Sequence, residues 1–413
     1  MRKSIGTILV MFSAISLFAQ QQNLDYYLTR ALKNSPLLKD YLNQTMISQT
    51  DSILAKLNFG PQFNIISNNS YAPVISGWGY DEIITNLRNV NALATVSQEI
   101  AGRRYRQNQY EAIRLQSQSA MNSGKISEQD LKKNVIGQYI ITYGDWQQYN
   151  FNIEMLGLFK NEETILKKLA ENGVYKQTEF LTFLVNLKQQ ELVSTRLKNQ
   201  YQNDFALLNF ICGIEDTSFI QLPDPNMSAE TLPEFFNSIF YGQFIVDSLK
   251  LKNADKQIDF SYKPKINLLA DGGYLSSLTY QPERNFGASV GISINIPLFN
   301  GTFRKLRHDK IAIEEQTRQY YRDFYINQYH QQINRFLQQL HANQKIKEQI
   351  SVQIDYTQTL MNAYQKLLQT GDIRITDYML AIGNYLTAKN LLVQNIIERY
   401  QIINELNYWN RTK

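Results

Sequence analysis

The sequence predicts a mixed but mainly α-helical protein, built as two tandem repeats of long antiparallel helices with short strands ahead of each helical pair. Three observations support this fold class. Prolines are missing from residues 74–222 and 298–413, and proline is excluded from helix interiors because it lacks the N–H and clashes with the preceding turn. A glycine turn occurs twice, as "NGVYKQTEFL" at 172–181 and "TGDIRITDYM" at 370–379. Strands with alternating apolar residues precede both helical pairs.

The second proline-free region predicts one helical hairpin. Residues 302–370 contain neither Gly nor Pro, and a helix of these 69 residues would run roughly 100 Å at about 1.5 Å per residue. Its apolar residues recur at spacings of three and four, at Tyr329, Ile333, Phe336, Leu340, Leu360, Tyr364 and Leu367. The spacing resumes beyond Gly371, at Ile375, Met379, Ile382 and Leu386. One narrow apolar seam on a polar helix is typical of a coiled coil, so we expect two antiparallel helices joined at Gly371.

The first proline-free region predicts a less regular hairpin, with helices over about 103–172 and 174–212. Four glycines interrupt its first helix, at Gly124, Gly137, Gly144 and Gly157. The run Asn122-Ser123-Gly124, followed by Ser127 and Asp130, has the composition of a helix end and a new N-cap. We therefore expect a break in this helix near residue 124.

Two strands are expected before each hairpin, over about 61–71 and 90–101 in the first repeat and about 263–274 and 286–299 in the second. The segment "FGASVGISINIPLF" places Phe286, Ala288, Val290, Ile292, Ile294, Ile296 and Leu298 on one face. Its counterpart "NVNALATVSQEIAG" alternates in the same way. The loops between paired strands, about 72–89 and 275–285, carry Gly, Pro, Ser and Tyr.

The order of elements is thus duplicated, with 71 residues from Gly102 to Gly173 and 70 from Gly301 to Gly371. We divide the chain into repeat 1 at 20–212, a Pro-rich connector or equatorial region at 213–248, and repeat 2 at 249–413. Residues 1–19 are expected to be a secretory signal peptide, because Arg2 and Lys3 precede an apolar run and a small residue at Ala19.

Composition narrows the class of protein further. The only cysteine is Cys212, so neither an internal disulfide nor acylation of a new N-terminal cysteine is expected, and a buried free thiol is the simplest reading. After the signal there is no run of about 18 apolar residues, which a membrane-spanning helix needs. The formal charge is +5, with acids and bases interspersed, and nothing indicates nucleic-acid binding.

Four strands with one apolar face cannot close into a barrel alone. An open sheet edge cannot lie in lipid, because its N–H and C=O groups would have no partners. We therefore expect the chain to pool its strands with copies of itself, with the apolar face toward hydrocarbon and the Ser, Gly and Asn face toward water.

Several short motifs of the chain resemble those of a known protein family. The chain resembles outer membrane efflux proteins of the TolC type, in the run Pro297-Leu298-Phe299-Asn300-Gly301, the repeated Gly-x4-Thr-acid turn and the segment Tyr385-Leu386-Thr387-Ala388-Lys389. The resemblance implies a homotrimer with a twelve-stranded outer-membrane β-barrel, continuous with a periplasmic α-helical barrel. It also implies docking to a periplasmic adaptor (a membrane fusion protein) and an inner-membrane transporter, in the cell envelope of a Gram-negative bacterium.

The site residues expected from this resemblance lie at the helical tips and at the strand-to-helix junctions. Thr178 and Thr376 are expected to cap the second helix of each hairpin, with Glu179 and Asp377 as an acidic ring at the periplasmic gate. Leu380 stands where a second acidic ring would lie, so a single ring is expected. The expected adaptor contacts at the tip turns are Gly173, Val174, Thr178, Gly371, Ile373 and Thr376. The junction residues are Gly102, Pro297 and Gly301.

Enzyme chemistry finds little support in the sequence. The three histidines, His308, His330 and His341, are not joined by a cysteine or a convergent pair of carboxylates that would complete a zinc site. No phosphate-binding loop, nucleophile elbow or Cys/His pair is present. We therefore expect no enzyme activity, cofactor or metal.

The sequence favours a passive exit duct for efflux or type I secretion over an exported coiled-coil scaffold without a pore, because a scaffold needs no lipid-facing strands. An exported hydrolase is a third and weaker alternative.

Overall fold

The structure is a computed structural model that describes residues 22–410, apart from 217, 232–233, 280 and 299–300. The predicted signal peptide, residues 1–19, lies outside the described residues, as do Phe299 and Asn300 of the junction motif. The chain forms two compact units, which we describe separately. Unit 1 comprises the residues up to Ser35, Asp130–Glu230 and Phe336–Tyr408, and unit 2 comprises Pro36–Gln129, Thr231–Arg335 and the residues from Trp409.

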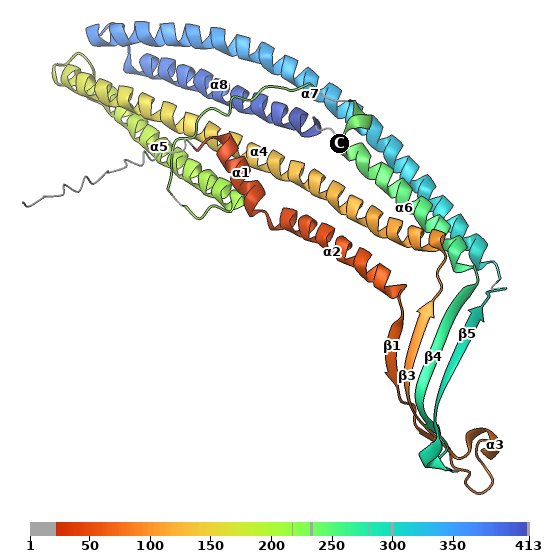
Figure 1. Ribbon diagram of the computed structural model, residues 1–413. Helices are drawn as coiled ribbons and strands as arrows, with labels where there is room; N and C mark the ends of the chain where they lie inside the picture. Colours follow the sequence, from red (N-terminus) through yellow and green to blue (C-terminus); the bar gives the residue numbers. More distant parts are fainter. Residues whose placement is uncertain (1–21, 217, 232–233, 280, 299–300, 411–413) are drawn as a thin grey trace, which may run out of the picture. The chain divides into compact units, whose positions relative to one another are not determined.

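The described elements follow the predicted order of helix, strands and helical hairpin, twice (Figure 1). The first repeat contains α1 (Leu24–Asn34), α2 (Pro36–Asn58), β1 (Gln62–Ile66), β2 (Ser70–Tyr71), α3 (Glu82–Thr85), β3 (Arg88–Glu99), α4 (Arg103–Glu171) and α5 (Gln177–Cys212). The second contains η1 (Phe235–Asn237), α6 (Ile239–Ser261), β4 (Lys265–Ser276), η2 (Pro282–Arg284), β5 (Phe286–Asn295), α7 (Phe303–Thr370) and α8 (Ile375–Trp409). The start of α6 therefore falls inside the segment 213–248 that was assigned to the connector.

In unit 1 the helices lie side by side in the order α5, α4, α8, α7. The hydroxyl of Thr142 on α4 donates to the carbonyl of Asp204 on α5 at 3.1 Å. A Cβ added at Gly144 of α4 would lie 2.1 Å from Cδ1 of Ile397 on α8. The amides of Asn343 on α7 and Asn395 on α8 each donate to the other's backbone carbonyl, at 3.0 and 3.2 Å. The predicted antiparallel hairpins are thus confirmed, and the two hairpins pack against each other through α4 and α8.

The apolar seam of the second hairpin is confirmed as core. Ile375 and Ile382 are buried in one cluster with residues of the first hairpin such as Phe183. Near the tip of α7 the predicted seam is off by one position: Leu360 and Leu367 are 40% and 41% exposed, and their neighbours Met361 and Leu368 are buried instead. A second cluster of unit 1 joins α1, α4, α5 and the connector, and includes Cys212. This cysteine is buried and free, as the sequence predicts, and burial raises the pKa of its thiol to about 12.

The expected break in the first long helix is wrong. α4 runs without interruption from Arg103 to Glu171. Two of its glycines lie where another helix comes close. A Cβ added at Gly124 would lie 3.2 Å from Cβ and 3.4 Å from the ring Cγ of Tyr41, and one added at Gly144 would overlap Ile397. A glycine inside a helix costs about 1 kcal/mol relative to alanine, and close packing offsets that cost here.

In unit 2 the helices lie in the order α2, α4, α6, α7, and polar side chains join them. Asn108 on α4 and Asn253 on α6 are buried and hydrogen-bonded to each other, with the Asn108 amide 3.0 Å from the Asn253 carbonyl. The hydroxyl of Ser127 on α4 donates to Tyr41 of α2 at 3.4 Å.

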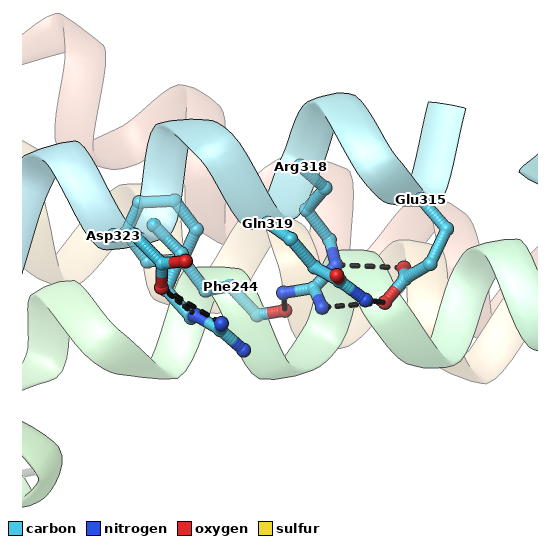
Figure 2. A network of polar contacts seen from close by, with 6 residues as sticks. Phe244, Glu315, Arg318, Gln319 and Asp323 are labelled. Atoms are coloured by element: carbon cyan, nitrogen blue, oxygen red, sulfur yellow. Dashed lines mark hydrogen bonds and ion pairs between the residues drawn. The ribbon is translucent and has the colours of Figure 1, made fainter. Parts of the chain in front are cut away.

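Arg318 joins α7 to α6 (Figure 2). Its guanidinium binds both carboxylate oxygens of Glu315, at 2.8 and 2.6 Å, and donates to the Phe244 carbonyl at 3.1 Å. The Gln319 amide also donates to Glu315, at 3.1 Å. These donors, with Arg318 first, lower the pKa of Glu315 to about 2. The bidentate pair lies within α7 and holds the guanidinium in place, so that its remaining N–H can reach the Phe244 carbonyl of α6.

The sheet of unit 2 is antiparallel, with the main strands in the order β1, β3, β4, β5 and with β2 paired to β3 (Figure 1). In its register Val96 lies opposite Phe63 and Ala270, and Ala270 lies opposite Val290. The four predicted strands are present, although β5 ends at Asn295 rather than 299 and the strand expected at 61–71 is divided into β1 and β2.

Candidate functional site

One face of the sheet is apolar across all four main strands. Residues that lie directly opposite in an antiparallel ladder share a face, so the register assigns every side chain. The apolar face carries Phe63, Ile65, Val90, Ala92, Ala94, Val96, Ile266, Leu268, Ala270, Tyr274, Phe286, Ala288, Val290, Ile292 and Ile294. None of these side chains is buried, and those on the outer strands β1 and β5 are exposed, with Val290 88% and Ile65 85% exposed.

This apolar face has the dimensions of a lipid-facing band. From Phe286 to Ile294 it runs eight residues along β5, or roughly 27 Å at about 3.4 Å per residue. The apolar band of an outer-membrane barrel is about 25 Å tall, and its strands need roughly 9–11 residues. At one end of the band the rings of Tyr274 and Phe286 meet edge to face, with centroids 5.2 Å apart.

The opposite face of the sheet is mixed, since it carries Ile66, Leu93, Leu269 and Leu275 beside polar and glycine positions. One row crosses all four strands and consists of Asn64, Thr95, Asp271 and Ser289. The hydroxyl of Ser289 donates to the Asp271 carboxylate at 2.5 Å. An exposed apolar face with a mixed face behind it is the reverse of a soluble sheet, which buries its apolar side.

The outer edges of this sheet have no strand partner among the described residues. β1 pairs only with β3 and β5 pairs only with β4 in the described ladders. An edge strand presents a row of unpaired N–H and C=O groups, which another chain can pair with.

The tip of the first hairpin ends α4 on a left-handed glycine. Gly173 has φ +79°, which glycine adopts at little cost, as predicted. The N–H of Val174 donates to the Leu169 carbonyl at 2.9 Å, and that of Gly173 donates to Ala170 at 3.1 Å. This pattern satisfies the last carbonyls of the helix.

The tip of the second hairpin repeats this geometry. Gly371 has φ +81°, and the N–H of Asp372 donates to the Leu367 carbonyl at 3.1 Å. Unlike Gly173, Gly371 is also crowded, because an added Cβ would lie 2.6 Å from Cγ1 of Val174. The two tip turns therefore contact each other.

Tyr175 joins the two tips, and no sequence pattern points to this role. Its side chain is only 6% exposed, and its hydroxyl lies 2.8 Å from the Leu368 carbonyl and 3.0 Å from the Ile373 carbonyl. Burial, followed by the charges of Glu179 and Asp372, raises the pKa of this phenol. Ile373, an expected adaptor contact, is partly buried against the tip core.

The threonines are not the helix caps that the sequence predicts. α5 begins at Gln177 after the N-cap residue Lys176, and α8 begins at Ile375, so Thr178 and Thr376 both lie inside their helices. The helices start two residues earlier than the threonines indicate, and the adjoining Tyr175 and Ile373 are hydrogen-bonded to each other across the two hairpins.

The two tip carboxylates have different partners. Glu179 accepts the backbone N–H of Lys176 at 3.3 Å, which caps α5. Asp377 forms a bidentate ion pair with Arg374, at 3.0 and 3.1 Å. This pair, assisted by the charge of Glu179, raises the pKa of Arg374, a residue that the sequence reasoning did not single out. Leu380 is 66% exposed and contributes no charge at this level.

The three junction residues differ in what they require. Gly301 has φ +65° and would be strained by a side chain, whereas an added Cβ at Gly102 would meet nothing within 4 Å. Pro297 follows the end of β5 in an exposed, irregular segment, where its missing N–H costs no ladder bond.

Groups that could hold a metal or span a membrane as a helix were also sought in the described part of the chain. No cluster of three His, Cys, Asp or Glu side chains suits a metal ion there. The His308 ring instead pairs with Asp255 at 2.6 Å. Within the same residues, no helix has an apolar stretch long enough to cross a bilayer.

Comparison with known proteins gives a structural likeness only. No protein-family model and no curated protein sequence matches this chain. Among solved structures, the fold is similar to that of CusC, described with transmembrane channel formation, at a TM-score of 0.76 and 15% identity over 95% of this chain and 93% of that one. It is similar to the outer membrane protein VceC of Vibrio cholerae, at a TM-score of 0.76 and 12% identity over 94% and 96%. It also matches the CmeC outer membrane channel of Campylobacter jejuni, at a TM-score of 0.75 and 13% identity over 94% and 85%. The chain therefore has the fold of these outer-membrane channels.

Proposed function

We propose that this protein is an outer-membrane exit duct, TolC-like, through which a tripartite efflux or type I secretion system releases its substrate. The observation that carries this proposal is the exposed apolar face of the sheet, which runs across four strands whose outer edges lack partners. Three copies would supply twelve strands and close the barrel, since closure is how such a sheet can satisfy its edges in lipid. The likeness to outer membrane channels supports the same function.

In this function the protein is a passive conduit and not an enzyme. The polar row of Asn64, Thr95, Asp271 and Ser289 would face the water-filled lumen. Selection would come from pore width and charge, while an inner-membrane transporter supplies the energy. A signal peptide at residues 1–19 would direct export, and the protein would not be a lipoprotein.

The tips are the proposed docking end for the periplasmic adaptor. Gly173, Val174 and Thr178 are exposed there, as is Thr376. Asp377 and Glu179 would form the gate level, with Arg374 between carboxylates that attract it. Ile373 and Gly371 would act mainly by holding the turn, because both are partly covered.

A matched pair of variants tests the duct. Val290 and Ser289 are neighbours on opposite faces of β5. We expect Val290→Arg to lose stable membrane insertion, since a cation on the lipid face near the midplane costs roughly 2–4 kcal/mol. Ser289→Arg should insert normally and change the ion selectivity of single channels in planar bilayers.

The alternative function, an exported coiled-coil scaffold without a pore, predicts a different result. The wild-type protein would be washed from membranes by high salt, would be silent in planar bilayers, and both variants would behave alike. That outcome would exclude the duct.

A further inference from the structure

A groove lies where the first repeat changes from strand to helix. Its volume is about 440 Å³, and it lies entirely within unit 2, between the end of β3 with the start of α4 and the end of α6 with the start of β4. The N–H of Ile100 donates to the Ile266 carbonyl at 2.8 Å, so the groove opens directly at the last bond of the β3–β4 ladder.

The groove is lined mainly by cations. Arg103 and Arg104 come from the start of α4, and Lys263 and Lys265 flank Pro264 before β4. Glu99 also lines it, but in the described part of the chain no carboxylate lies within ion-pair distance of Arg103, Arg104 or Lys265. The Lys263 ammonium lies over the Phe260 ring, 4.5 Å from its centroid.

At the strand-to-helix junction of the second repeat, an arginine has an acidic partner. Arg304, in the first turn of α7, pairs with Asp259 at 2.6 Å, and His308 contacts the same carboxylate at 3.3 Å. Arg304 at the second junction therefore has an internal partner, whereas Arg103 and Arg104 at the first junction are exposed.

Apolar surface continues from the groove onto the sheet. Ile100 lines the groove, is 48% exposed, and belongs by alternation to the apolar face, as does Ile266. A ligand with an anionic head and an apolar tail would thus place its charge beside the arginines and its tail along β3 and β4.

We propose that this groove binds the phosphate headgroup of an anionic phospholipid in the periplasmic leaflet of the outer membrane, one per protomer. The inference rests on the proposed function, which puts the apolar face in lipid and the strand-to-helix junction at the periplasmic boundary. Guanidinium groups bind phosphate oxygens in a bidentate manner, and basic clusters at a membrane boundary attract anionic lipid. The unpaired N–H groups at the start of α4 add to the attraction for an anion.

Native mass spectrometry of the detergent-purified full protein tests this site. The probes are phosphatidylglycerol and zwitterionic phosphatidylethanolamine, added at equal concentration. We expect the wild type to prefer phosphatidylglycerol, and Arg103→Gln/Arg104→Gln to weaken its binding roughly 25-fold, since each cation near an anionic lipid contributes about fivefold. A second variant, Lys263→Gln/Lys265→Gln, should weaken binding similarly.

The matched control is Lys345→Gln/Lys347→Gln. It removes the same charge from exposed positions on α7 in unit 1, and we expect unchanged lipid binding. Circular dichroism checks that each variant keeps its helix content.

Three results would overturn the proposal. One is equal affinity of the wild type for the two lipids, and another is full retention of phosphatidylglycerol by both groove variants. The third is complete displacement of the lipid by millimolar inorganic phosphate, which would make the site one for free phosphate. Flotation with liposomes tests the duct function separately. A protein that inserts into liposomes but shows no lipid preference would contradict this inference and leave the proposed duct function standing.

Discussion

The two helical hairpins share a backbone design but differ in the polar groups that they bury. Both turns end a long helix on a left-handed glycine with the same pair of terminal hydrogen bonds, and both place an acid three residues into the next helix. Asp145 and Asn343 stand at matching positions, each 28 residues before its tip glycine. The comparison indicates that turn geometry restricts the sequence more tightly than the chemistry of the buried layer does.

The buried layer of the second hairpin is neutral and reciprocal. Asn343 and Asn395 are each 3% exposed, and each amide donates to the other's carbonyl. At the matching level of the first hairpin, Asp145 faces Asp204, and one Asp145 oxygen is buried without a hydrogen-bond donor among the described groups. Desolvation first, and then the neighbouring Asp204, raises the pKa of Asp145 to about 8.

The largest expected effect comes from the tip glycines. Gly371→Ala should lower the free energy of unfolding by about 3 kcal/mol, from the left-handed backbone and from overlap with Val174. Gly173→Ala meets no atom and should cost only about 1–2 kcal/mol. Urea titration followed by circular dichroism measures both.

The double variant Gly371→Ala/Val174→Ala separates the two causes. Removing the Val174 methyl groups should reduce the loss of unfolding free energy to that expected for Gly173→Ala. Equal losses for the two single variants would show that the tips do not pack as described.

The next effect is a pH dependence that arises at the buried carboxyl group of the first hairpin. Because the folded pKa of Asp145 is raised, the folded state binds more protons than the unfolded state between pH 3.8 and about 8. Stability should therefore fall as pH rises through this window and level off above it. Asp145→Asn should remove the fall and add roughly 2 kcal/mol at pH 9, after discounting for partial exposure.

Asn343→Asp is the converse variant. It introduces a carboxyl group at a buried position whose partner is an amide, and it should make the second hairpin lose stability as pH rises. Urea titrations at pH 5, 7 and 9 measure both variants. A flat pH profile for the wild type would contradict the carboxyl pair.

Local sequence signals predicted the parts of this molecule that local physics controls. The seam from Ile375 to Leu386 and the two φ-positive glycines follow from spacing and from the steric freedom of glycine, and the structure confirms them. The alternation around Val290 likewise predicted the apolar face of the sheet. The break at Gly124 was wrong because helix propensity does not record the α2 ring that packs there.

Features formed by segments far apart in the chain could not be predicted from the sequence. Tyr175 is unremarkable in sequence, and its role depends on carbonyls nearly two hundred positions away. The Thr178 cap failed for the same reason, since Lys176 takes the N-cap position after this anchor. The cationic groove needs the pairing of β3 with β4, which brings Arg103 beside Lys265.

The smallest expected effect distinguishes the two tip carboxylates. The Arg374–Asp377 pair is exposed, with 74% and 36% of the side chains accessible, so Arg374→Gln should lower the stability only slightly. The loss should shrink further in 1 M salt, because exposed ion pairs are screened. Glu179→Ala removes a backbone cap instead, and should cost about 0.5–1 kcal/mol with little dependence on salt.

Thermal unfolding at 0.05 and 1 M sodium chloride measures this difference. If Glu179 and Arg374 variants respond to salt equally, Glu179 takes part in the ion pairing at the tip, and both hairpins use charge in the same way. If only the Arg374 variant responds, the first tip is held by backbone capping and Tyr175, and the second tip carries the salt-sensitive contact. The tip would then loosen in high salt from its second hairpin first, since the first retains the Tyr175 hydrogen bond and the backbone cap at Glu179.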